Sequence, residues 1–244
     1  MRNDGCSSAG DAADGHTWDF HEGFESLFED TSHGGGMKAS IPILLAAFVP
    51  LLLAAAGTMI EHGWLGHGLY KLGLLFVPLL FGMRFAFPQR MKKESATVAL
   101  STGLLLGLAA WLLIELILPR VADPRTIRAA FDARYHYTPS SAIAAACLIA
   151  TANAVLEEWF YRGFLDDAGG KILSLFCFSL QHFIVFRGLA GTGPAFIAAL
   201  AVVPAGWIWS RIRTRHGLAA ASLSHIVTDA VLLVGGLRLL GYVS

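Results

Sequence analysis

Two adjacent carboxylates, Glu157 and Glu158, end a long apolar run at residues 141–156, and Arg162 follows one helical turn later. The run is long enough to enter a bilayer, where a charged side chain costs about 2.5–3.5 kcal/mol or more. Charges at such depth usually face a polar interior and serve a function. Two other apolar stretches carry polar groups of a complementary kind: His182 in one, and His225 with Asp229 in the other.

Helical spacing assigns different roles to the two glutamates. Glu158 and Arg162 are four residues apart and share one helix face, so an ion pair between them is expected. Glu157 points about 100° away around the helix, which leaves it free for chemistry. Asn153 lies one turn before Glu157 and is predicted to hydrogen-bond it or share its polar face.

These residue types suit hydrolysis. A carboxylate and an imidazole that bracket a water form a general base, and further donors can stabilise an oxyanion. His225 and Asp229 are again four residues apart and present two polar groups to a common point. Glu157, His182 and His225 would also suit a catalytic zinc, which takes three protein ligands and keeps one position open. The spacing of these residues does not distinguish a metal-free general base from a zinc site. Buried acids and histidines also occur in proton-coupled carriers, and a non-catalytic binding or immunity scaffold is the other alternative.

The elements that must position these groups are membrane helices. Hydrophobic residues make up 55% of the chain and charged residues 15%, against about 25% charged in a soluble domain. The mean hydropathy is +0.58. We therefore predict an all-α, polytopic transmembrane helix bundle with about seven spans. The spans are expected at residues 40–60, 68–88, 96–118, 141–164, 172–188, 194–210 and 217–238.

The first 36 residues form a separate region, with one basic and eight acidic residues and hence a net charge of −7. Their Gly-, Asp- and Ser-rich composition predicts a disordered acidic tail, and Met37, followed by Lys38 and an apolar run, is a second candidate translation start. We expect accessory transmembrane helices at residues 37–140 and a catalytic core at residues 141–244. No basic surface is combined with a recognition motif, so nucleic-acid binding is not expected.

Basic loops set the expected orientation. Arg84, Arg90, Lys92 and Lys93 follow the second span, and three arginines at positions 211–215 follow the sixth. Both loops therefore belong in the cytoplasm. Glu157, His182 and His225 then lie about 12–15 Å from the cytoplasmic ends of three separate helices, by helical rise. That shared depth indicates one site.

Three smaller expectations concern single residues. Gly103 and Gly107 form a small-xxx-small pair that suits close helix contact. Trp207 and Trp209 fit an aromatic belt at the membrane interface. His67 lies just before the expected second span and is predicted to face solvent or lipid headgroups.

Taken together, the three motifs resemble the signatures of one family. The motifs are Glu157-Glu158-x-x-x-Arg162, Phe178-x-x-x-His182 and His225-x-x-x-Asp229, in this order on successive helices across roughly residues 141–236. They are similar to those of the CAAX-type prenyl protease and bacteriocin-processing family, whose members are glutamate-type intramembrane endopeptidases.

The resemblance implies that Glu157, with His182, deprotonates the attacking water. It implies an oxyanion role for His225 and Asp229, support from Glu158 and Arg162, and no metal cofactor. The family's last position is Asn or Asp, and an Asp must hold a proton or act through its partner to donate to an oxyanion. The implied substrate is a membrane-associated or lipidated protein or peptide, cut near a terminus. We expect a multi-pass protein of the bacterial cytoplasmic membrane, with the site opening toward the cytoplasm.

Overall fold

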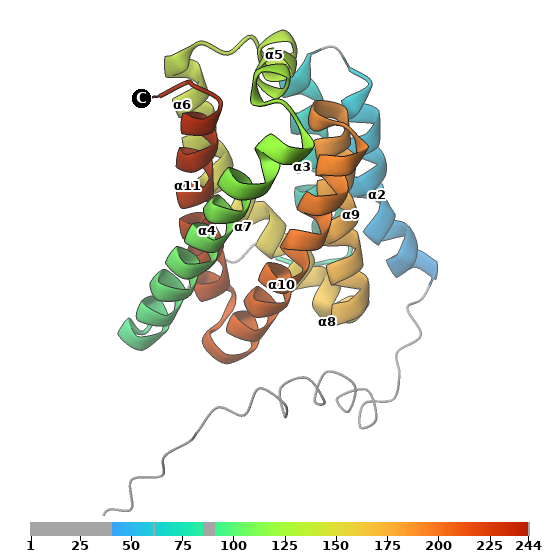
Figure 1. Cartoon of the computed structure of the whole chain (residues 1–244). Helices are drawn as coiled ribbons and strands as arrows, with labels where there is room; N and C mark the ends of the chain where they lie inside the picture. The colour runs from blue at the N-terminus through green and yellow to red at the C-terminus, as the bar shows by residue number, and fades with distance from the viewer. Residues whose placement is uncertain (1–40, 61, 85–90, 244) are drawn as a thin grey trace, which may run out of the picture. The chain divides into compact units, whose positions relative to one another are not determined.

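The computed structural model describes residues 41–60, 62–84 and 91–243, and regular structure in these ranges is entirely helical, as predicted. The predicted acidic tail, residues 1–36, lies outside them. Figure 1 shows the helices in chain order. Their bounds are α2 Ile41–Thr58, α3 Gly63–Leu80, α4 Lys93–Val121, α5 Pro124–Tyr135, α6 Pro139–Leu148, η1 Ile149–Asn153, α7 Ala154–Glu157, η2 Glu158–Leu165, α8 Asp166–Ala168, α9 Lys171–Ala190, α10 Thr192–His216 and α11 Leu218–Leu239.

Within the described residues, six helical segments are long and apolar enough to cross a membrane, one fewer than the sequence predicts. The segments are α2, α4, the continuous helix Pro139–Ala168, α9, α10 and α11. The predicted second span at 68–88 is instead α3, Gly63–Leu80, which begins five residues earlier. It lies outside the set because His67 and Lys71 lower its hydropathy, although it is as long as α2.

The continuous helix Pro139–Ala168 holds both glutamates and is not a regular α-helix. Two segments, η1 and η2, are π-helical, and the four-residue α7 that ends at Glu157 separates them. A π turn is wider than an α turn and is found mostly near functional sites. The two wide turns change the helix register on both sides of Glu157.

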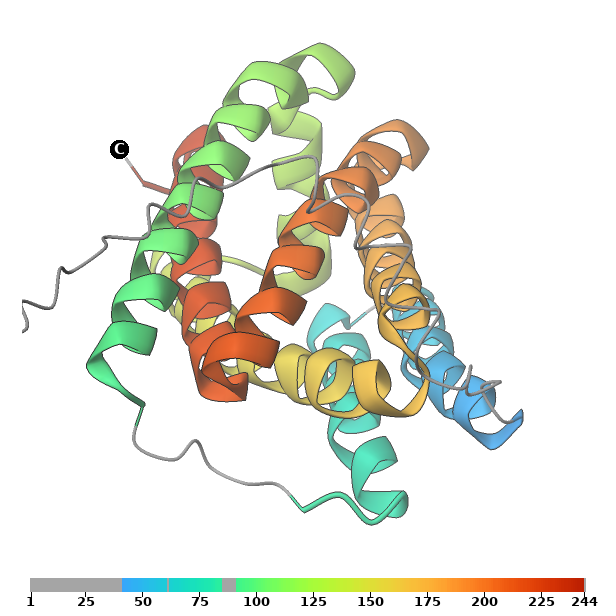
Figure 2. The ribbon, with the colours of Figure 1, turned by 90° about the horizontal axis from the view of Figure 1, so that it is seen from below.

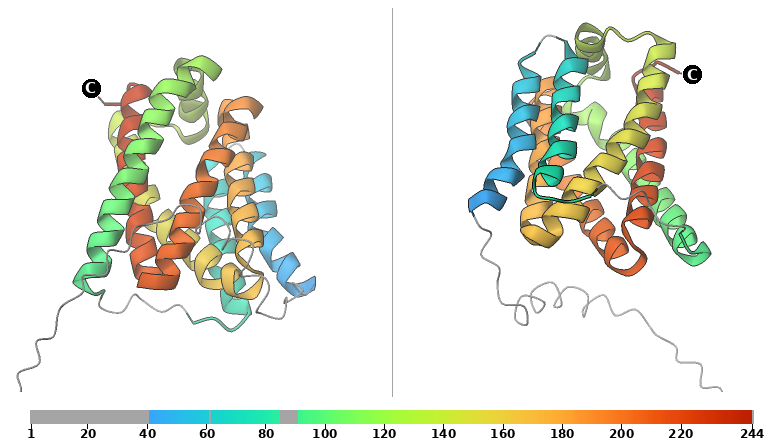
Figure 3. Two further views of the ribbon diagram at one scale, coloured as in Figure 1. Left: turned by 60° about the horizontal axis from the view of Figure 1, so that its bottom comes forward. Right: turned by 180° about the vertical axis from the view of Figure 1, so that it is seen from behind.

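Close glycine contacts bring neighbouring helices together. The predicted pair on α4 is one of them: a Cβ built on Gly103 would lie 2.5 Å from the Ser224 carbonyl oxygen of α11, and one on Gly107 would lie 2.7 Å from Val231. Side chains larger than glycine would force α4 and α11 apart, which confirms that this pair suits close contact. Figure 3 shows α4 running alongside α11 in both of its views.

Short connections make the last helices antiparallel neighbours. A single glycine, Gly191, lies between α9 and α10, and Gly217 alone lies between α10 and α11. Their φ angles are 86° and 87°, a region that glycine adopts readily and other L-residues rarely do. Figure 2, seen from below, shows the tight turn from α10 into α11. These turns bring His182 on α9 and His225 on α11 next to the helix that holds Glu157.

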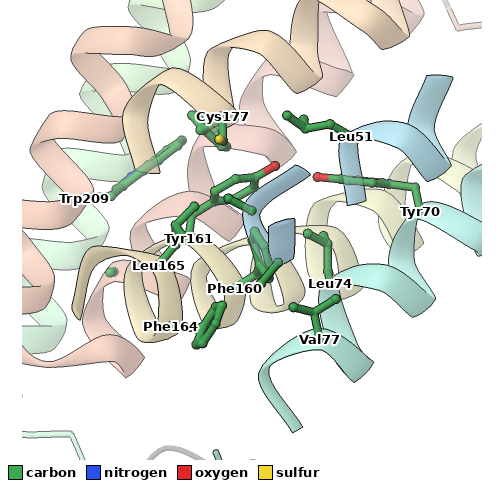
Figure 4. Packing of buried hydrophobic residues seen from close by; sticks show 14 of the residues in the cluster. Leu51, Tyr70, Leu74, Val77, Phe160, Tyr161, Phe164, Leu165, Cys177 and Trp209 are labelled. Carbon is green, nitrogen blue, oxygen red and sulfur yellow. The ribbon is translucent and has the colours of Figure 1, made fainter. Parts of the chain in front are cut away.

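Buried aromatic side chains fill the space between η2 and its neighbours (Figure 4). Phe160 and Phe164 lie beside Leu74 and Val77 of α3, and Phe160 is fully buried. On the opposite side, Tyr161 lies with its ring edge-on to Phe178 of α9, 5.2 Å between ring centroids. The helix that holds the glutamates is therefore packed on both sides by the first half and the second half of the chain.

Candidate active site

The two glutamates and Arg162 are completely buried, each with an exposed fraction of 0%. The predicted pair between Glu158 and Arg162 is present, with Arg162 Nη1 3.4 Å from Glu158 Oε1. The Arg162 guanidinium also lies 4.1 Å from the centre of the Phe178 ring, a distance at which the cation is attracted to the ring face. Burial of both charges makes this pair structurally important, because the loss of either partner would leave an unpaired charge.

His225 links the two glutamates to Asp229. Its Nδ1 lies 2.9 Å from Glu158 Oε1, and its Nε2 lies 3.9 Å from Glu157 Oε2 and 3.5 Å from Asp229 Oδ1. Both ring nitrogens therefore face carboxylate oxygens. The predicted i, i+4 relation between His225 and Asp229 holds, and α11 brings both residues to the site.

His182 lies on α9 at the edge of the site and is partly exposed. Its Nδ1 lies 2.9 Å from the Phe178 carbonyl oxygen. A carbonyl can only accept, so Nδ1 carries the hydrogen and Nε2 is left available to bind a water or a substrate group. The charges of His182 and Glu157 are close enough to interact. The arrangement can place a water between this imidazole and the carboxylate.

Trp209 also belongs to the site, which corrects the prediction that it lies in an interfacial belt. It is only 3% exposed, and its ring stacks on His225 with 3.8 Å between centroids and 17° between planes. Its Nε1 donates to Ser224 Oγ at 3.3 Å. The belt prediction was wrong because composition shows only that a tryptophan is near a helix end. It does not show which helix face meets a neighbour.

Asn153 does not make the first of its two predicted contacts, a hydrogen bond to Glu157. The hydrogen-bond donors to Glu157 Oε1 are Tyr70 and Lys71, and Glu157 Oε2 has no hydrogen-bond partner within the part of the chain described here. Asn153 is the last residue of η1. The α-helical turn α7 keeps the one-turn spacing to Glu157, but Tyr70 and Lys71 of α3 bind Glu157 Oε1.

Two site residues come from α3 and were missed in the sequence. Lys71 Nζ lies 3.1 Å from Glu157 Oε1, and Tyr70 Oη donates to the same oxygen at 3.3 Å. His67, predicted to face solvent or headgroups, is instead partly buried on α3 one turn before Lys71, near enough to Glu157 for their charges to interact. The available signal was a lone lysine within an apolar stretch, at a depth where a charge needs a partner.

Among the residues described, no group of three or more His, Cys, Asp and Glu side chains is arranged to hold a metal ion. The glutamate of the alternative zinc set, Glu157, already has an ammonium group on one oxygen. A divalent ion at that oxygen would have to displace Lys71.

One family model matches the part of the chain that carries Glu157, His182, His225 and Asp229. Residues 139–231 match the family model described as type II CAAX prenyl endopeptidase Rce1-like. These residues are an Rce1-like domain. No curated protein and no solved structure matched the chain.

The Rce1-like domain contains Glu157, His182, His225 and Asp229, and it confirms the family inferred from the three motifs. Members of this family are CAAX prenyl endopeptidases, which are peptide hydrolases, and the domain supports a CAAX-type intramembrane protease at the level of the family. Together with six candidate spans, the domain identifies a multi-pass membrane protein. Tyr70 and Lys71 lie outside the matched residues.

Proposed function

We propose that this protein hydrolyses a peptide bond near one end of a membrane-associated or lipidated protein, using a water activated by Glu157 and His182. The observation that carries the proposal is the state of the Glu157 carboxylate. Oε1 is held by two donors, whereas Oε2 is buried, has no hydrogen-bond partner in the described residues, and faces His225 Nε2 at 3.9 Å. Oε2 is therefore suited to accept a proton from a bound water, while Oε1 fixes the orientation of the carboxylate.

The proposed reaction runs in two steps. Glu157 takes one proton from the water, whose oxygen attacks the carbonyl carbon, and the carbonyl electron pair becomes an oxyanion. When the oxyanion collapses, the carbon–nitrogen bond breaks, and the proton held by Glu157 passes to the leaving nitrogen. A positioned base of this kind contributes about 10²–10⁴-fold to a rate.

His225 and Asp229 are proposed to stabilise the oxyanion. A protonated His225 can donate from Nδ1 to Glu158 and still direct Nε2 toward the reaction centre. Asp229 then acts through His225 as its charge partner. In this proposal the Asp229 carboxylate does not itself need to donate a hydrogen bond to the oxyanion. Arg162 neutralises Glu158 and so prevents two adjacent carboxylates from repelling each other.

Access to the buried site is proposed to occur where its side chains reach the surface. The Lys71 and Asp229 side chains are 13% and 15% exposed, and His182 is also partly exposed, whereas Glu157, Glu158 and Arg162 are sealed. The basic residues that follow α3 and those at the end of α10 support a cytoplasmic position for that end of the bundle. We propose a bacterial cytoplasmic membrane as the location and the cytoplasmic side as the side of cleavage.

Catalysis is proposed to need no metal, because Lys71 already neutralises Glu157. The alternative is a zinc ion held by Glu157, His182 and His225. Processing that survives a membrane-permeant chelator supports the metal-free form. Processing that stops with the chelator and returns only with added zinc would establish the alternative.

The experiment that tests the function compares protein termini in membranes from cells that make the wild type or Glu157→Gln at equal abundance. One or a few proteins should retain a terminal segment in the variant, and His182→Ala should reproduce the same change. Identical termini in all three strains, together with a phenotype on deletion, would overturn the proposal. The polar core would then be assigned to binding, or to transport if proteoliposomes show ion flux.

A further inference from the structure

α3 contributes a partly buried cation to the site from outside the Rce1-like domain. Lys71 Nζ lies 3.1 Å from Glu157 Oε1, and the lysine and glutamate side chains are 13% and 1% exposed. Tyr70, the preceding residue, is 2% exposed and donates to the same oxygen at 3.3 Å. Figure 4 shows the hydroxyl groups of Tyr70 and Tyr161 pointing toward one another, from α3 and η2. The contact therefore joins the first half of the chain to the helix that holds the glutamates.

The Lys71 contact makes the two oxygens of Glu157 unequal. Lys71 and Tyr70 both bind Oε1, while Oε2 keeps its lone pairs and faces His225. A carboxylate held by one oxygen cannot rotate freely, so Oε2 stays directed at the position where water must bind. Preorganisation of this type is what allows a general base to work without a reorganisation step.

Charge neutrality gives a second, independent reason for the lysine. Three acidic side chains meet in the site, and Arg162 neutralises only Glu158. Lys71 is the cation in contact with Glu157, and its charge also acts on Asp229. Without Lys71, an ionised Glu157 would depend on the imidazoles alone, at a depth where an unpaired charge is costly. The titratable and charged groups facing Glu157 are His67, Tyr70 and Lys71 on α3, Glu158, Tyr161 and Arg162 on η2, His182 on α9, and His225 and Asp229 on α11.

We propose that Lys71, assisted by Tyr70, is a positioning residue for Glu157, so that the catalytic unit includes α3 as well as the Rce1-like domain. The inference rests on the proposed function of Glu157. Lys71 keeps the base ionised and Tyr70 fixes its orientation. Neither residue touches the reacting atoms.

The test uses the full chain in native membranes, with the terminal segment retained by Glu157→Gln as the processing reporter. Lys71→Met should slow processing at neutral pH and move the acid limb of the pH–rate profile to higher pH by about 1–3 units, the effect of losing an opposite charge within 4–6 Å. Lys71→Arg, which keeps the charge, should leave the acid limb where the wild type has it. Tyr70→Phe, which removes one hydrogen bond to the carboxylate, should lower the rate and move the limb in the same direction by less than Lys71→Met does. Lys93→Met, at an exposed lysine that begins α4, is the matched control and should change nothing.

Infrared titration of the protein in proteoliposomes gives a readout that needs no substrate. The carboxyl band that Glu157→Gln removes is assigned to Glu157, and it should appear at higher pH in Lys71→Met than in the wild type. Coincident acid limbs and coincident titrations in these two proteins would overturn the inference, and Lys71 would then only fill space. If Glu157→Gln does not change processing, the proposed function fails, and the infrared titration still decides whether Lys71 controls the charge of Glu157.

Discussion

Gly206 on α10 lies against the buried Arg162, and its replacement by alanine measures how rigidly that arginine is held. A Cβ built at this position would lie 2.6 Å from Arg162 Nη2, 3.0 Å from Leu175 Cδ2 and 3.2 Å from Phe178 Cδ1. Arg162 could give way only by moving relative to Glu158, its partner at 3.4 Å. Forcing extra volume into a packed interior costs about 1–3 kcal/mol.

The helix itself partly offsets this cost. Alanine stabilises a helix interior by about 0.5–1 kcal/mol relative to glycine. Gly206→Ala should therefore lose up to about 2.5 kcal/mol of stability in total. It should also reduce processing, because the arginine that neutralises Glu158 is displaced. Thermal unfolding in detergent, followed by tryptophan fluorescence, measures the first effect, and the terminal-segment reporter measures the second.

The matched control is Gly193→Ala on the same helix. A Cβ at Gly193 meets no atom within 4 Å, so this variant should be as stable as the wild type or slightly more stable. Should Gly206→Ala unfold at or above the temperature of Gly193→Ala, the reasoning is refuted. Arg162 would then be able to move away from the new methyl group, and its ion pair with Glu158 would not depend on a fixed position of the guanidinium.

Two further variants test the groups around His225. Arg162→Gln should destabilise the protein by about 3–5 kcal/mol, since it leaves Glu158 buried without its cation. Thermal unfolding in detergent measures this change. An unfolding temperature equal to that of the wild type would show that Glu158 is neutral in the folded protein. Trp209→Leu removes the ring stacked 3.8 Å from His225 and should slow processing up to about tenfold, the rate equivalent of an aromatic pair. Trp209→Phe should retain most of the rate, and equal losses in both variants would indicate that the indole N–H, rather than the stack, matters.

Helical spacing within one stretch predicts local pairs well. Glu158 with Arg162 and His225 with Asp229 both lie within 3.5 Å, as expected for residues four apart on a helix. The shared depth of separate helices also predicted that they meet at one place. In each case the inference needed only the rise and turn of a regular helix.

Contacts between helices, and departures from regular helix, could not be predicted in this way. Lys71 and Trp209 point to the site because of how α3 and α10 are rotated about their own axes, and no local pattern specifies that rotation. The two π segments are a second case. They lie on either side of α7, and no spacing of polar and apolar residues in this stretch specifies them.

The helices differ widely in length, and this has a consequence for the surrounding lipid. At 1.5 Å per residue, the 18 residues of α2 span about 27 Å, and the 29 residues of α4 span about 44 Å. A bilayer has a hydrocarbon core of about 30 Å, so lipid is expected to thin beside α2, and α4 to tilt or project beyond the core. Such mismatch costs fractions of a kcal/mol for each ångström. The enzyme is therefore expected to respond to the thickness of its membrane, and the thin side is the one where α2 packs against α3, the helix that carries the lysine of the site.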